Sequence, residues 1–90
     1  MIYPQPARGD HCHMAFKIPG PGNVVIRIWN AKGELAAEIA ERHENGAGTH
    51  VCRVAIDKMP AGVYFYKVEC RMDDGRTHKI KAGKFLKALK

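Results

Sequence analysis

Apolar and polar residues alternate along several short segments of this 90-residue chain. Val24, Ile26 and Ile28 would share one face of an extended strand and Arg27 would lie on the other, because successive side chains of a strand point to opposite sides. Prolines and glycine-containing pairs separate the segments, which leaves them about six to ten residues long. Short strands with frequent turns predict an all-β fold. The clearest predicted strands cover residues 13–18, 24–29, 50–56 and 63–70.

The last of these segments predicts how the chain ends. Tyr64 and Tyr66 fall on one face of the strand and Phe65 on the other. Asp74 and Gly75 follow, and both residue types accept the positive φ angles of a tight hairpin. We therefore expect a final strand after this turn, paired with the strand that contains the aromatic residues.

Residues 34–43 give two conflicting signals. The segment is rich in helix-forming residues, and Leu35 and Ile39 form an i, i+4 apolar pair, so propensity alone predicts a helix. Leu35, Ala37 and Ile39 also alternate with polar or smaller residues as they would in a strand. The local pattern supports both structures.

Six motifs, taken in order, resemble those of a known family of small immunoglobulin-like domains. They are Tyr3-Pro4-Gln5-Pro6, Lys17-Ile18-Pro19, the strand, turn and strand of residues 24–35, Gly48-Thr49-His50, Met59-Pro60-Ala61-Gly62-Val63-Tyr64-Phe65-Tyr66 and Lys84-Phe85-Leu86-Lys87. The fifth motif is the most specific, because it is similar to the family pattern Leu-Pro-x-Gly-Val-Tyr. The family comprises the C-terminal sorting domains of type IX secretion cargo and the related Ig-like domain of flagellar hook-capping proteins.

The resemblance implies an immunoglobulin-like β-sandwich of about six or seven strands. The length of the chain predicts one domain over residues 1–90, with an extended segment over residues 1–12 and a basic terminal strand over residues 76–90. In this fold residues 34–42 form a strand and not a helix. Gln5 stands where the family usually has Asn. No cargo precedes the motifs in this sequence, so the tail of a larger cargo and a separate subunit of an assembly both stay possible.

Five residues of these motifs are expected to hold the architecture. Pro60 restricts φ to about −65°, and Gly62 accepts backbone angles that other residues avoid, so together they can turn the chain from one sheet to the next. Tyr64 can bury its ring and donate its hydroxyl to the backbone, as corner tyrosines of sandwiches do. The predicted structural residues are Gly33, Pro60, Gly62, Tyr64 and Tyr66.

Charge is unevenly distributed along the chain. The net charge is +6, and residues 76–90 carry six Lys or Arg and no acid, so this segment accounts for all of it. Such a segment attracts acidic surfaces or polyanions. Lysines also protect edge strands from unwanted pairing, and residues 81–90 could form a short basic amphipathic helix, although an edge strand is favoured. The predicted partner-binding residues are Lys79, Lys81, Lys84, Lys87 and Lys90.

Few residues suggest chemistry. His11, Cys12 and His13 form one local cluster of metal-ligand types, a weak candidate because a structural zinc site needs four ligands. The chain contains no serine, and no carboxylate pair or nucleophile with a positioned base is evident, so we expect neither catalysis nor a cofactor. Cys52 and Cys70 are predicted to be packed thiols, with a disulfide as the alternative.

These observations predict a non-catalytic module for protein attachment, sorting or assembly. Its expected partner is a protein or the secretion or assembly machinery, and an anionic cell-surface polymer is a further candidate. A basic nucleic-acid-binding β-domain that uses Tyr64, Phe65 and Tyr66 is a less favoured alternative, as is a metal- or cofactor-binding accessory subunit. No apolar stretch is long enough to span a membrane. The expected location is the cell envelope or the exterior if the chain is part of an exported precursor.

Overall fold

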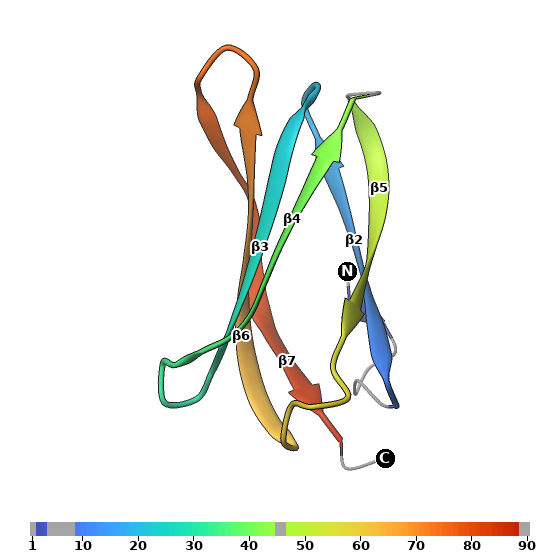
Figure 1. The fold of residues 1–90 in the computed structure, drawn as a ribbon, viewed down its shortest axis with the longest axis vertical. Coiled ribbons are helices and arrows are strands. Elements are labelled where there is room, and N and C mark those ends of the chain that lie inside the picture. The colour runs from blue at the N-terminus through green and yellow to red at the C-terminus, as the bar shows by residue number, and fades with distance from the viewer. Residues whose placement is uncertain (1, 4–8, 45–46, 89–90) are drawn as a thin grey trace.

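The computed structural model describes residues 2–3, 9–44 and 47–88, which form two antiparallel β-sheets packed face to face (Figure 1). One sheet has the strand order β1-β2-β5 and the other β4-β3-β6-β7. No helix occurs in these residues, so the prediction of an all-β immunoglobulin-like sandwich is confirmed. The strands are β1 (Ile2–Tyr3), β2 (His11–Ile18), β3 (Gly22–Asn30), β4 (Leu35–His43), β5 (Gly48–Ala55), β6 (Gly62–Met72) and β7 (Thr77–Lys87).

The core lies between the two sheets and follows the alternation of the sequence. Val24, Ile26 and Ile28 of β3 are at most 1% exposed and face the opposite sheet, which contributes Met14 and Val54. Both inner faces are apolar, and burial of apolar surface is the main force that holds such layers together. The two sheets therefore cohere through side chains that the period-two pattern had placed on one face.

Residues 35–43 form a strand, so the prediction of a helix from propensity alone is wrong and the prediction from the family resemblance is right. β4 pairs antiparallel with β3, with Ile39 opposite Ile26. Ala37 and Ile39 pack against the core. Pairing with a neighbouring strand satisfies the backbone and places these two side chains on the core, and this tertiary gain outweighs the small differences in intrinsic propensity.

Residues 31–34 form the turn that joins β3 to β4. Gly33 has φ +86° and donates its N–H to the Asn30 carbonyl at 3.0 Å. The Asn30 side chain accepts hydrogen bonds from the N–H groups of Lys32 and Glu34, both at 3.0 Å. A left-handed residue at this position of such a turn favours glycine, which explains Gly33.

The turn between β6 and β7 has the same geometry. Gly75 has φ +91° and donates to the Met72 carbonyl at 3.0 Å. We expected positive φ at Asp74 as well, but within the described part of the chain only glycines have positive φ. Asp74 instead accepts a hydrogen bond from the Arg76 N–H at 2.9 Å. Its carboxylate therefore stabilises the turn.

The loop between β5 and β6 carries the chain from one sheet to the other. Two side chains hold its consecutive carbonyls: the Tyr64 hydroxyl donates to Pro60 O, and the Lys87 ammonium donates to Met59 O. Gly62 has φ +152°, which a side chain would strain. The Tyr64 ring also stacks on Phe85, with centroids 5.6 Å apart. The crossover is thus fixed by residues of β6 and of the end of β7.

We predict that Tyr64→Phe lowers the free energy of unfolding by about 1 kcal/mol, because it removes one intramolecular hydrogen bond and leaves the ring in place. Urea denaturation measures this. Tyr66→Phe is the matched control, since Tyr66 is 8% exposed and its hydroxyl makes no hydrogen bond among the described residues. Equal effects of the two substitutions would contradict the role of the Tyr64 hydroxyl.

Candidate functional site

The basic terminal strand does not present its lysines on one face. Lys84 lies opposite Phe65 and Lys79 opposite Glu69, and both are exposed on the outer face of the four-stranded sheet. Lys81 lies opposite the buried Val68 and is half-buried. The register shifts between the partners of Lys79 and Lys81, as in a β-bulge, and this irregularity allows Lys79 and Lys84 to share a face although they are five positions apart.

Lys87 is a correction to the sequence prediction. Its residue is only 8% exposed, and its ammonium group donates to the carbonyl of Met59. Lys87 lies on the inner face together with Phe85, so its aliphatic stem is packed and its charged end reaches a backbone acceptor. It holds the crossover loop and is not available to a partner. Lys90, the other terminal lysine of the prediction, lies outside the described residues.

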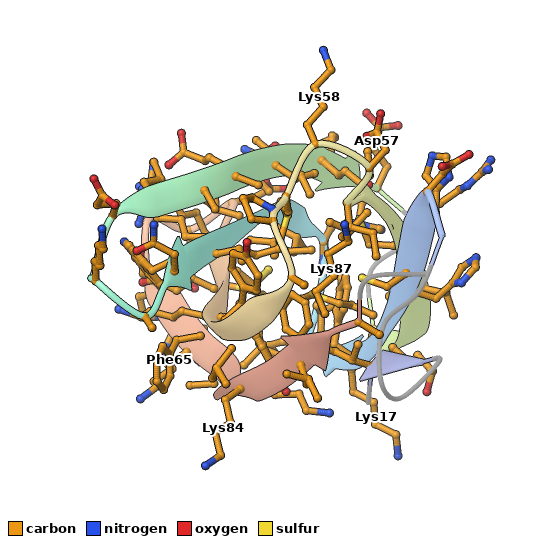
Figure 2. All side chains as sticks on the ribbon, turned by 90° about the horizontal axis from the view of Figure 1, so that it is seen from below. Lys17, Asp57, Lys58, Phe65, Lys84 and Lys87 are labelled. Carbon is orange, nitrogen blue, oxygen red and sulfur yellow. The ribbon has the colours of Figure 1, made fainter. Side chains whose placement is uncertain are left out.

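Figure 2 shows this division of the lysines, with Lys84 directed outward beside Phe65 and Lys87 directed between the sheets. Among the described residues, no acid forms an ion pair with Lys84. The exposed cations Lys79 and Lys84 therefore remain as candidates for contact with an acidic partner.

An exposed apolar surface accompanies these lysines, and we call it the outer patch: Trp29, Leu35, Val63, Phe65 and Leu86. One row of cross-strand neighbours runs across the four strands and consists of Leu35, Trp29, Phe65 and Lys84. Val63 and Leu86 form the adjacent row. The patch continues into a shallow hollow lined by Trp29, Phe65, Lys67, Ala82 and Lys84.

Sequence reasoning missed the outer patch. The alternation showed that Val63 and Phe65 oppose the tyrosines of the same strand, which was a usable signal. The cross-strand register that brings Trp29, Leu35 and Leu86 beside them required the structure.

Ion pairs border the outer patch. Arg27 donates to Glu38 at 2.6 Å and approaches Glu69 at 3.5 Å, and Lys67 also lies 3.5 Å from Glu69. The hydrogen bond from Arg27 to Glu38 is the main cause that raises the pKa of the guanidinium. The carboxylates of Glu38 and Glu69 are thus neutralised by cations on the same face of the sheet.

The His11, Cys12 and His13 cluster does not converge on one site. Cys12 is fully buried on the inner face of β2, whereas His11 and His13 alternate to the outer face and are half-exposed. His11 Nδ1 lies 3.2 Å from the Arg53 guanidinium. Across the described ranges, no three His, Cys, Asp or Glu side chains are placed to hold a metal ion.

A second group of polar residues connects the edges of the two sheets. His43 of β4 and His50 of β5 have ring centroids 4.5 Å apart, and the His43 ring also meets Phe16 edge-on. His43 Nε2 lies 3.2 Å from Glu41 Oε2, yet this buried nitrogen makes no hydrogen bond among the described residues. Glu41 accepts a hydrogen bond from the Cys52 thiol at 2.9 Å. β4 and β5 are each the last strand of their sheet, so this group closes one side of the sandwich.

All three cysteines are buried free thiols, as the prediction of packed thiols requires. Burial is the main cause that raises the pKa of Cys12, Cys52 and Cys70. At Cys52 the hydrogen bond to Glu41 adds to this, and the pKa of the thiol is raised to about 12. A thiol with a raised pKa stays protonated and is a poor nucleophile at neutral pH.

The aromatic strand does not form a platform for bases. Tyr64 and Tyr66 are 4% and 8% exposed and face the core, so only Phe65 of the three faces outward. The structure also has no helix, in the ranges it describes, that is long and apolar enough to cross a membrane.

The chain forms an immunoglobulin-like module of two packed antiparallel sheets. The corner residue Tyr64 holds the loop between β5 and β6 through a hydrogen bond, and the exposed lysines and apolar residues lie on the faces of the sheets. The chain belongs to the family of secretion system C-terminal sorting domains, since the sequence profile of that family matches residues 1–81. This family consists of non-catalytic modules for secretion sorting, and the resemblance noted from the motifs is confirmed. No curated protein sequence matches the chain.

Among solved structures, the fold is similar to the crystal structure of FlgD from Xanthomonas campestris, which is described in connection with hook capping in flagellar assembly. The TM-score is 0.75 at 16% sequence identity, over 90% of this chain. The chain spans 64% of the length of that FlgD chain. At this identity the similarity establishes the shared fold.

Lys87→Met is predicted to lower the free energy of unfolding by about 1–2 kcal/mol, because a charged hydrogen bond to the crossover loop is lost. Lys84→Met is the matched control and should change it by less than about 0.5 kcal/mol, as exposed substitutions usually do. Thermal and urea denaturation of both variants provide the measurement. A Lys87→Met variant as stable as the wild type would show that Lys87 does not hold the loop.

The raised pKa of Cys52 predicts a loss of stability at alkaline pH. Below pH 9 the thiol is neutral in both states; above pH 9 the unfolded chain releases the proton and the folded chain retains it up to about pH 12, so folding is progressively disfavoured. Cys52→Ala should flatten the decline of the melting temperature between pH 9 and pH 11 more than Cys12→Ala does, because only Cys52 faces Glu41. Equal slopes in the two variants would contradict this.

Proposed function

We propose that this chain directs an attached protein to a secretion machinery, whose protein component recognises the exposed lysines of β7. The observation that carries the proposal is the match of residues 1–81 to the C-terminal sorting domains. Lys79 and Lys84 support it because they share an exposed face, and charged groups at an interface steer encounter with a partner of opposite sign. Lys81, half-buried at the sheet edge, is a weaker contributor.

The proposed mechanism involves binding and no chemistry. The buried residues are committed to the core, and the three thiols are held protonated. The module would act at the cell envelope as part of an exported protein. An assembly subunit like the hook-capping protein is the alternative role, and the similarity of fold alone supports it.

The test joins the chain to the C-terminus of a secreted reporter enzyme in a bacterium that has this secretion system. The double variant Lys79→Glu/Lys84→Glu should reduce the exported fraction of the reporter several-fold, because it reverses two contacts with an acidic partner. Lys17→Glu/Lys58→Glu is the matched control: it makes the same change in net charge at two exposed lysines that lie on β2 and on the crossover loop.

Thermal melts of both double variants test whether each variant retains the fold. Export of the Lys79→Glu/Lys84→Glu reporter at the level of the control would refute the role of these lysines. Failure of the wild-type fusion to leave the cell would refute the sorting function itself.

A further inference from the structure

We propose that the outer patch is the docking surface for a protein component of the secretion machinery, one whose contact surface is apolar at its centre and carries carboxylates at its rim. This inference rests on the proposed function and adds a second, apolar determinant to the basic strand. Its starting observation is the distribution of exposed large hydrophobic residues. Four of the five described, Leu35, Val63, Phe65 and Leu86, are 42–53% exposed and lie on this end of one sheet face. The fifth, Val51, lies on the other sheet.

The arrangement of these residues is that of an interface centre. Phe65 lies directly opposite Trp29 on β3 and opposite Lys84 on β7, and Leu35 extends the row on β4. Aromatic residues at the centre of an interface supply most of the binding energy, and a surrounding rim excludes water. Since inner-face residues already supply the core of the sandwich, packing of this chain alone does not account for apolar side chains here.

The charges around the outer patch indicate the chemistry of the partner. Glu38 and Glu69 are already paired with Arg27, whereas Lys84 has no acidic partner among the described residues. Lys79 adds a second exposed cation on the same face. A partner that brings carboxylates to Lys84 and apolar groups to Phe65 therefore complements this surface.

Three other occupants fit the same surface less well. An anionic membrane attracts clusters of unpaired cations, whereas Arg27 and Lys67 beside the patch are already paired with Glu38 and Glu69. The bases of a nucleic acid would need aromatic rings on which to stack. Three of the five patch residues are aliphatic and cannot stack with bases. A second copy of this chain would bring Lys84 and a net charge of +6 against the same charges.

The experiment measures export of the same reporter fusion carrying Phe65→Glu. We expect the exported fraction to fall about tenfold, since truncation of an interface centre commonly costs that factor or more. Val51→Glu is the matched control, because Val51 is 52% exposed on a strand of the other sheet and the substitution adds the same charge. Leu86→Glu, at 48% exposure, is the second variant, and thermal melts identify which variants are folded.

The outcomes separate this inference from the function on which it rests. Export of folded Phe65→Glu and Leu86→Glu at the level of Val51→Glu overturns the docking surface and leaves the sorting function intact. Loss of export in the wild-type fusion overturns both. The isolated domain is also sedimented alone and with phosphatidylglycerol vesicles: a dimer or vesicle binding that Phe65→Glu abolishes overturns the inference in favour of a second copy or a membrane.

Discussion

The crossover between the two sheets depends on two hydrogen bonds to consecutive carbonyls. Tyr64 bonds Pro60 and Lys87 bonds Met59, and both donors come from strands of the four-stranded sheet. The loop that they hold connects β5 of one sheet to β6 of the other, so the two bonds fix one of the connections between the layers. A buried carbonyl without a donor would cost free energy, and these side chains supply donors where no neighbouring strand does.

This arrangement connects two motifs that lie far apart in the sequence. Lys87 of the last motif bonds the loop that contains Pro60, because Lys87 lies opposite Gly62 in the β6–β7 ladder. The end of β7 is therefore part of the scaffold, while Lys79 and Lys84 remain free for contact on the outer face. The direction of each side chain therefore decides which lysines of this strand are buried and which are exposed.

The two faces of the four-stranded sheet carry different kinds of side chain. The inner face carries the fully packed residues of β3 and β6. The outer face carries the ion pairs of Arg27 and, beyond them, the outer patch. Because strand side chains alternate, neither face restricts the other, and the outer face can vary without loss of the core. This separation explains how one sandwich fold supports unrelated recognition functions.

The sequence by itself determined the all-β class, the core face of β3 and the glycine turn after β6, because period-two alternation and turn residues are local properties. The ordered motifs also identified β4 as a strand against its helical propensity. Only the tertiary structure decided which lysines are exposed: an irregularity in register near Lys81 and the burial of Lys87 depend on partners 13 to 28 positions away. The outer patch arises in the same way, because cross-strand register joins residues from four strands and no pattern along one strand specifies that neighbourhood.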